Sequence, residues 1–483
     1  ADTRLAELAW AAGDARSCLF HARSAMAIIK DRVRAAEAGL IRTFPEPHIL
    51  PDAVYWKVLA ERALAASPEE QEWDADLDLA ISALTRDKSA LEDESSKLLL
   101  IGAQQRLFDL AMDVAYDVYL AQASAAGIER FLFLAEADRS TVLKSRLNAF
   151  AGIRFSGVPD SVIAQEQELL AALAVDANDR NSATDLDKHE RAYAGFMDRL
   201  RKDHPVYFAL RYDDPRIGLK DLRSSLVTPD RDLLLYAYAG EHLYMMVVRT
   251  DTVALIRTER EGIGGPLKAL NAAVRENRAE SFARLSAALY DHVFGPVAGL
   301  LRKKELLIVP DGDLQTLNFE VLMFEGADRG KLSDHMLIQK YAIAYLLSAT
   351  TAVQFSGLRE DRSNKALALA PGFSDDLKEE YIAKVGDSSR IDHQFLNHVR
   401  QPFALSTAEG LGDLLSAKVV VGGEASEKSF RDLAKEYGIL HLGTHAEMNE
   451  SSPLYSRLVL SKDGASVDAD ADGYLHAYEI YEL

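Results

Sequence analysis

Apolar residues in the first 200 positions recur at the spacing of an α-helix. They return every three or four positions from Leu5 to Ile28, with one interruption at Gly13-Asp14. Two further stretches, 103–120 and 128–147, repeat the pattern and are separated by a short turn that contains glycine. Helix pairs of this kind bury their apolar faces by stacking on one another. The pattern therefore predicts an all-α domain of helical repeats over residues 1–200.

Beyond residue 200 the apolar residues gather in short runs that are rich in β-branched and aromatic side chains. The candidate strands are 206–210, 233–238, 244–248, 253–257, 306–309, 341–345, 366–369, 419–421 and 439–442. Helices are expected between several of them, including one long helix over 265–301 and another over 426–437. Apolar strands that alternate with helices are typical of a mostly parallel sheet covered on both faces. We therefore predict an α/β domain over 201–483, with function at the carboxyl ends of its strands.

The charge of the chain restricts its partners. It has 75 acidic and 55 basic residues among 483, which gives a net charge of −20. Such a chain repels phosphates at long range, which argues against binding to nucleic acid or to an anionic membrane surface. No apolar run is long enough to span a membrane and no secretory leader is visible, so we expect a cytoplasmic protein. Because the chain begins with Ala1 and not with methionine, we also expect it to start inside a longer product.

The chain contains a single cysteine, Cys18. One cysteine cannot form an intramolecular disulfide or a four-cysteine zinc site. Cys18 lies within a predicted helix, where a small buried residue between packed helices needs no further role. A nucleophilic role would need a neighbouring base and a depressed pKa. We interpret Cys18 as a packing residue.

A histidine follows one of the last predicted strands. The strand 439–442 ends, and His445 occupies the turn beyond it. At the carboxyl edge of a parallel sheet, an exposed histidine is placed to act as a general base. The alternative is a histidine that is hydrogen-bonded for packing. His441, inside the strand, is interpreted as a packing residue.

Two parts of the chain resemble known families. Residues 1–35 resemble a tetratricopeptide repeat, with Gly13-Asp14 at its turn. Its packing positions are Leu5, Ala6 and Ala9 in the first helix and Cys18, Ala22 and Ala25 in the second. The chain from about residue 204 to the end resembles a CHAT domain, the caspase-like domain that often follows such repeats. The order and spacing of its segments carry the resemblance. These segments are 206–212, 221–226, 233–238, 242–248, 307–322, 345–348, 422–430, His441-Leu442-Gly443-Thr444-His445, 456–460, 473–475 and 479–480.

This resemblance implies a caspase-like three-layer fold and a cysteine peptidase of the caspase and separase type. His445 would be the base of a Cys–His dyad. The backbone N–H of Ala446, where caspases proper have glycine, would help to hold the oxyanion. The family's nucleophile is a cysteine that ends the strand following the segment equivalent to 479–483. We therefore expect this chain to stop before the nucleophile strand, which leaves the dyad incomplete.

An acidic segment near the end of the chain has the spacing of a calcium-binding loop. Asp468, Asp470, Asp472 and Glu479, with a glycine at 473, reproduce the alternate carboxylates, turn glycine and distal glutamate of an EF-hand loop. The preceding run 458–460 predicts a strand, where an EF-hand has a helix. The alternative is an acidic, solvated hairpin. We keep calcium as a candidate and predict no other cofactor.

The leading hypothesis is a TPR-CHAT cysteine endopeptidase that cleaves a protein substrate in bacterial defence or signalling. Its helical half would bind a regulatory protein or complex, as the concave surfaces of stacked repeats do. The alternative is a non-catalytic helical-repeat scaffold with a degenerate caspase-like domain. The missing nucleophile favours this alternative for the chain as written, and a cysteine soon after Leu483 would favour the peptidase.

Overall fold

The computed structural model describes most of the chain. The described residues are 2–37, 49–64, 73–88, 94–122, 125–149, 159, 161–162, 164–166, 168–169, 172, 183–204, 208, 217–324, 331–356, 364–386, 388–449, 455–462 and 472–481. They group into two compact units. Unit 1 comprises Ala1–Ala149 and Phe208–Leu358, and unit 2 comprises Phe150–Tyr207 and Arg359–Leu483. The domain boundary expected at residue 200 marks a change in sequence pattern, and it stays a prediction.

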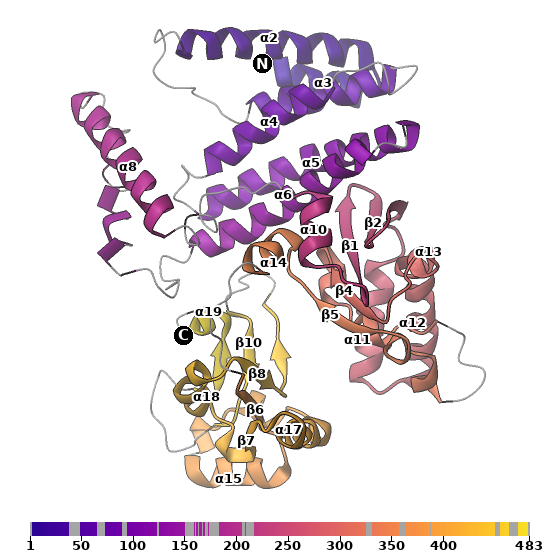
Figure 1. Ribbon diagram of the computed structural model, residues 1–483, viewed down its shortest axis with the longest axis vertical. Coiled ribbons are helices and arrows are strands. Elements are labelled where there is room, and N and C mark those ends of the chain that lie inside the picture. The colour runs from indigo at the N-terminus through magenta and orange to yellow at the C-terminus, as the bar shows by residue number, and fades with distance from the viewer. Residues whose placement is uncertain are drawn as a thin grey trace. The chain divides into compact units, whose positions relative to one another are not determined.

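The helical character predicted for the N-terminal region is confirmed (Figure 1). Its helices are α1 (Asp2–Ala11), α2 (Ala15–Glu37), α3 (Ile49–Leu64), α4 (Trp73–Lys88), α5 (Glu94–Gln122) and α6 (Ala125–Ala149). The break between α1 and α2 falls at Gly13, whose φ of +78° favours glycine. Asp14 then caps α2, because its carboxylate accepts the backbone N–H of Ser17 at 3.0 Å. Tetratricopeptide repeats as such stay a prediction.

The second part of unit 1 contains a five-stranded sheet in the order β3-β2-β1-β4-β5. Its strands are β1 (Arg231–Ala239), β2 (His242–Val248), β3 (Val253–Glu259), β4 (Glu305–Val309) and β5 (Ala342–Tyr345). The pairs β1–β4 and β4–β5 are parallel, but β1–β2 and β2–β3 are antiparallel. The expectation of a mostly parallel sheet is therefore wrong for this sheet. The strands β1 and β2 are antiparallel because Gly240-Glu241, the two-residue connection between them, is long enough for a hairpin but too short for a crossover.

The helix expected over 265–301 is also broken. It consists of α11 (Gly264–Arg275), α12 (Ala279–Val293) and α13 (Gly295–Ala298). Asn277 lies between the first two with a φ of +53°, a left-handed conformation that asparagine tolerates better than most residues. Unit 1 also includes α10 (Leu219–Ser225) and α14 (Ala349–Ser356). The expected strand around 206–210 lies almost entirely outside the described residues.

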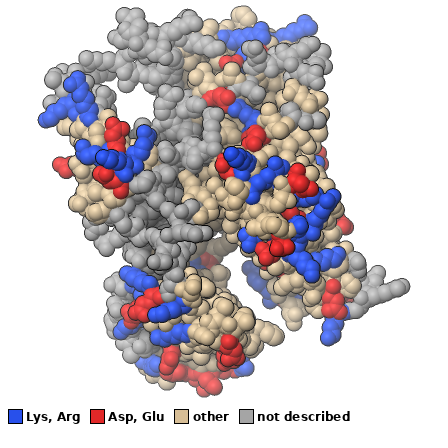
Figure 2. All heavy atoms as spheres, viewed as in Figure 1, with Lys and Arg blue, Asp and Glu red and all other residues tan. Residues whose placement is uncertain are grey.

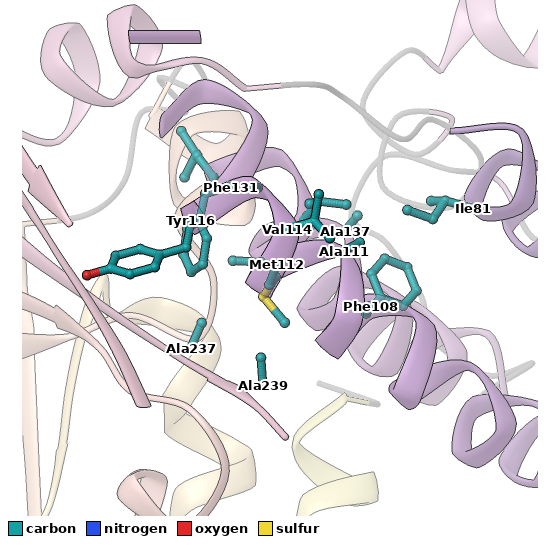
Figure 3. Close-up of a cluster of buried hydrophobic side chains, with 14 of the residues drawn as sticks. Ile81, Phe108, Ala111, Met112, Val114, Tyr116, Phe131, Ala137, Ala237 and Ala239 are labelled. Carbon is teal, nitrogen blue, oxygen red and sulfur yellow. The ribbon is translucent and has the colours of Figure 1, made fainter. Parts of the chain in front are cut away.

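Helices of the first half and strands of the second half share one hydrophobic core in unit 1. Figure 3 shows Tyr116 of α5 and Phe131 of α6 beside Ala237 and Ala239 of β1. Tyr244 of β2 contacts both aromatic rings, with centroids 5.2 Å from Tyr116 and 4.9 Å from Phe131. The small alanines of β1 leave room for these rings. The helices and this sheet therefore stabilise each other.

A buried ion pair ties α6 to the same sheet. The Glu136 carboxylate accepts hydrogen bonds from the Ser348 hydroxyl and the Thr350 backbone N–H, each at 2.8 Å. It also pairs with Arg139, which donates to the Tyr236 carbonyl of β1 at 2.6 Å. Burial opposes ionisation, but the Arg139 charge and these hydrogen bonds hold the pKa of Glu136 below its usual value. Glu136 thus fixes the beginning of α14 against α6.

Unit 2 contains two small sheets and several helices. The first sheet is fully parallel, in the order β7-β6-β8, with β6 (Ala366–Ala370), β7 (Lys418–Val421) and β8 (Ile439–Leu442). The second is antiparallel, in the order β11-β10-β9, with β9 (Ala446–Glu447), β10 (Arg457–Val459) and β11 (Tyr474–His476). The helices are α8 (Ala183–Asp203), α15 (Asp375–Val385), α16 (His393–Leu396), α17 (Pro402–Leu415), α18 (Glu427–Leu433) and α19 (Ala477–Tyr481). The helix expected over 426–437 is α18, followed by a 3₁₀ turn.

Candidate functional site

His445 lies where the two sheets of unit 2 meet. The strand β8 ends at Leu442, and β9 begins at Ala446, so His445 occupies the turn at the carboxyl end of β8, as the sequence predicts. The turn is anchored to β10, because the Thr444 hydroxyl donates to the Val459 carbonyl and the Val459 N–H donates to the His445 carbonyl at 2.9 Å. These bonds fix the backbone from which the imidazole projects.

The two ring nitrogens of His445 have different partners. Nε2 lies 2.9 Å from the carbonyl oxygen of Val399, in the loop before α17. Since a carbonyl only accepts, Nε2 carries the hydrogen. Nδ1 then carries the lone pair and lies 3.3 Å from the side-chain amide nitrogen of Gln401, which is a long hydrogen bond. We assign Nδ1 as the basic nitrogen of the ring on this geometry.

Two aromatic rings hold the plane of His445. His398 stacks on it, with ring centroids 5.0 Å apart and planes inclined by 22°. Phe373 contacts it at 4.9 Å from the loop after β6. Phe373 has a φ of +48°, which is rare for a residue with a bulky side chain, and costs on the order of 1–2 kcal/mol. The site tolerates this strained backbone at a ring that contacts the histidine.

Gly372 makes the loop after β6 possible. It has a φ of +72°, and a Cβ there would lie 2.6 Å from a side-chain carbon of Leu405 on α17. Its carbonyl accepts the backbone N–H of Gln401 at 2.9 Å. The same contact therefore connects the Phe373 loop to the segment that carries Val399 and Gln401.

The backbone N–H of Ala446 points away from β10. In the antiparallel pairing of β9 and β10, Ala446 lies opposite Leu458. Because the Val459 N–H bonds the His445 carbonyl, Ala446 and Leu458 form a non-hydrogen-bonded pair. The Ala446 N–H is thus not a donor of this ladder and is directed to the opposite edge of β9. A substrate oxygen at that edge would be within reach of this donor.

A cleft of about 530 Å³ begins one residue beyond Ala446. It is lined by Glu447, Met448, Asn449, Tyr455, Arg457 and His476. Glu447 and Arg457 form an ion pair, with Nε and Nη2 of the guanidinium each 2.7 Å from one carboxylate oxygen. Met448 and Tyr455 are exposed along it. The cleft therefore offers both polar and apolar contacts beside the histidine.

Comparison with protein families identifies the second half of the chain. Residues 283–483 match the family model of the CHAT domain. The chain contains a CHAT domain. A CHAT domain implies a caspase-like peptidase family. The match runs through parts of both compact units and includes His445, Ala446 and the cleft. No curated protein matches the chain.

The cysteine of the chain lies outside the matched residues. Cys18 is fully buried between α2 and α3, and its thiol faces the Trp56 carbonyl at 3.7 Å. Burial, with a smaller contribution from Asp14, raises its pKa to about 11. A nucleophile needs the opposite shift. The interpretation of Cys18 as a packing residue is confirmed.

The calcium candidate of the CHAT domain falls partly outside the described residues, since Asp468 and Asp470 lie there. Asp472 accepts the backbone N–H of Tyr474 at 2.8 Å, and Glu479 accepts that of His476 at 2.6 Å. Glu479 also pairs with Arg431 of α18. Among the described residues, no group of three or more His, Cys, Asp or Glu side chains is arranged to hold a metal ion. Calcium binding stays a prediction.

Sequence reasoning missed several residues around the histidine of the CHAT domain. Val399 acts through its carbonyl, which no residue type signals. Phe373, His398 and Gln401 come from loops 44 to 72 positions earlier in the chain. Only the fold brings them together.

His441 lies on β8 with a buried Nε2 that has no hydrogen-bond partner in the described part of the chain. None of the described helices is long and apolar enough to cross a membrane.

Proposed function

We propose that the CHAT domain of this chain supplies the general base of a caspase-like cysteine endopeptidase, with His445 as that base. The observation that carries the proposal is the position of the His445 ring. It stands at the carboxyl end of a parallel strand, with Nε2 bound to the Val399 carbonyl and Nδ1 carrying its lone pair. The thiol would come from a segment outside residues 1–483, because Cys18 is buried and hard to ionise.

The proposed reaction is acyl transfer to this thiol. Nδ1 of His445 takes the thiol proton, and the thiolate attacks the carbonyl carbon of the scissile peptide bond. The carbonyl electrons move to the oxygen, which the Ala446 N–H stabilises. The protonated Nδ1 then donates its proton to the leaving amine as the C–N bond breaks. Water, deprotonated by the same nitrogen, hydrolyses the thioester and releases the thiol.

The edge of the parallel sheet supports this source of the thiol. In the described residues, β8 is the last strand of the order β7-β6-β8, and its Ile439 and Leu440 are 46% and 43% exposed. A further parallel strand on this edge would cover both side chains. Its carboxyl end would lie at the same edge of the sheet as His445. A cysteine at that end would complete the dyad.

We propose a protein substrate and a role in bacterial defence or signalling, with the helical region binding a regulatory protein or complex. The cleft beside Ala446 suits the side chains of an extended peptide. On the face shown in Figure 2, Lys and Arg side chains are interspersed with Asp and Glu side chains. This mixture and the net charge of −20 favour protein over nucleic acid as partner. The proposed cytoplasmic location rests on the sequence argument alone.

A second candidate function is a non-catalytic scaffold. The observation that favours it is that the one thiol of residues 1–483 is the buried Cys18. In that case the CHAT domain would keep its fold and its cleft for binding. The two candidates differ in whether a thiol ever reaches His445.

The test uses the full gene product, including any residues encoded beyond Leu483, and a library of peptides from denatured proteins. We expect cleavage by the wild type and at least a hundredfold loss in His445→Ala, given the usual contribution of a general base. The control is His393→Ala, an exposed histidine of α16, which should cleave at the wild-type rate. A His445→Ala protein that cleaves like the wild type, or a wild type with no cleavage under any partner condition, would support the scaffold.

A further inference from the structure

A second histidine lies against the proposed base. The His398 side chain is 12% exposed and its ring stacks on His445. Its Nε2 lies 3.5 Å from an oxygen of Glu447, the first residue of the cleft. Phe373 contacts His398 edge-on at 5.5 Å. His398 thus lies between the base and a carboxylate that faces the substrate cleft.

Glu447 is itself held in place from three directions. Gln394 of α16 donates to both of its oxygens at 3.0 and 3.2 Å. Arg457 of β10 pairs with it from the other side. His398 is the third neighbour. A carboxylate with this many partners has one orientation, so its distance to the histidine pair is fixed.

We propose that His398 and Glu447 are positioning residues for His445, and that the two stacked imidazoles share one proton. This inference rests on the proposed function for its role in catalysis, but the shared proton is a property of the chain itself. Two imidazolium rings in face-to-face contact repel each other, so one positive charge on the pair is favoured over two. The Glu447 carboxylate favours the presence of that one charge.

The charged groups around His398 decide which ring takes the proton. Glu447 of β9 and Asp392 at the start of α16 favour a positive charge on His398. His445 and Lys378 of α15 oppose it, and the Lys378 ammonium donates to the His398 carbonyl at 2.6 Å. Arg457 also offsets part of the Glu447 charge. Burial and the His445 charge outweigh the carboxylates and lower the pKa of His398. These surroundings therefore reduce the share of the proton that His398 takes.

For catalysis, this arrangement favours His445 as the acceptor of the thiol proton. When His445 takes the proton of the thiol, His398 stays neutral and presents its ring face to the new cation, an arrangement that favours the charge. Glu447, one ring further away, stabilises the same charge without contacting the reacting atoms. Two charges on the stacked rings would repel each other, so His398 is neutral when His445 carries the proton.

The test is a pH titration of the histidine ring signals by NMR, on the 483-residue chain with isotope-labelled histidine. In His398→Phe, which keeps a flat ring without a charge, the His445 midpoint should rise by about 0.5 pH unit or more, because its competitor is gone. In Glu447→Gln, the His445 midpoint should fall by a similar amount, because the favourable charge is gone. His445→Gln assigns the signal, and His393→Phe is the control.

Opposite shifts in the two variants are the signature of the shared proton. If His398 and Glu447 were merely structural, the His445 midpoint would move in the same direction in both variants, or the His445 signal would broaden in both. Midpoints within about 0.2 unit of the wild type in both variants would overturn the proposal. Circular dichroism identifies a variant that fails to fold. In that case the direction of the His445 midpoint shift in the other variant tests the proposal.

The titration needs neither thiol nor substrate, so its failure is distinct from failure of the proposed peptidase. In the full gene product, His398→Phe should keep KM and lower kcat mainly on the acid side of its pH profile. If the NMR shifts are as expected but the pH profile of kcat is unchanged, the two histidines share a proton that has no role in catalysis.

Discussion

The central strand β1 of the sheet in unit 1 and the edge strand β8 of the parallel sheet in unit 2 differ in what surrounds them. In unit 1, every residue of β1 after Arg231 is buried, and helices α5 and α6 pack against the strand. In unit 2, β8 has no described neighbour on one side, and its first two residues are exposed. The first sheet buries its central strand in a core shared with helices, while the second sheet places a histidine beyond the end of a partly exposed edge strand. Stability and chemistry are thus concentrated in different parts of this chain.

The largest stability effect is expected in the core of unit 1. Glu136→Ala would leave Arg139 buried without its counter-charge and remove the partner of Ser348 and Thr350. We expect a loss of about 3–5 kcal/mol in the free energy of unfolding, measured with urea. The control is Glu280→Ala on the exposed side of α12, which should change stability by less than about 0.5 kcal/mol. A loss below about 1 kcal/mol for Glu136→Ala would contradict the role of this ion pair.

The comparison between the two sheets can be tested with one substitution in each. Leu235 on β1 is fully buried, so Leu235→Ala should cost about 2–5 kcal/mol. Leu440 on β8 is 43% exposed, so Leu440→Ala should cost less than about 1 kcal/mol in this chain. Both values come from urea unfolding. In the full gene product the cost at Leu440 should increase, since we propose that a further strand covers it. Equal costs at the two positions in the 483-residue chain would show that β8 is not an open edge.

Much of this fold follows from local pattern. The runs that became β1, β2, β4, β6 and β8 are apolar and short, and the turn at Gly13-Asp14 has the residues that such a turn needs. Strand direction was harder to predict. A hairpin and a crossover can both follow an apolar strand, and only the length of the connection decides between them. The break at Asn277 depends on one left-handed residue, which periodicity does not detect.

The candidate site was predictable only at its centre. His445 follows directly from its place after a strand, and Ala446 follows from the family resemblance. The residues that determine its chemistry are a backbone carbonyl at Val399 and a ring at His398, which reach it from a different loop. Contacts of this kind depend on the packing of α16 and α17 against the sheet. They require tertiary structure, because nothing in the local sequence distinguishes His398 from an ordinary surface histidine.

The smallest predicted effect concerns a second buried carboxylate, which contrasts with Glu136. Glu427 of α18 is buried beside Glu479 and Arg431 and accepts the Gly473 N–H at 3.1 Å. Burial and the Glu479 charge raise its pKa to about 7, from an ordinary value of 4.5. The folded chain therefore holds a proton there that the unfolded chain releases between these values. Stability should fall as the pH rises from about 5 to about 8.

Glu427→Gln keeps a side-chain oxygen for the Gly473 N–H and cannot ionise. Relative to the wild type, the variant should gain on the order of 1 kcal/mol between pH 5 and pH 8, measured by urea unfolding at both values. Glu436→Gln, at an exposed position nearby, is the matched control and should follow the wild-type curve. If Glu427→Gln also runs parallel to the wild type, then Glu427 is ionised in the folded chain throughout this range, and Arg431 outweighs the effects of burial and of Glu479.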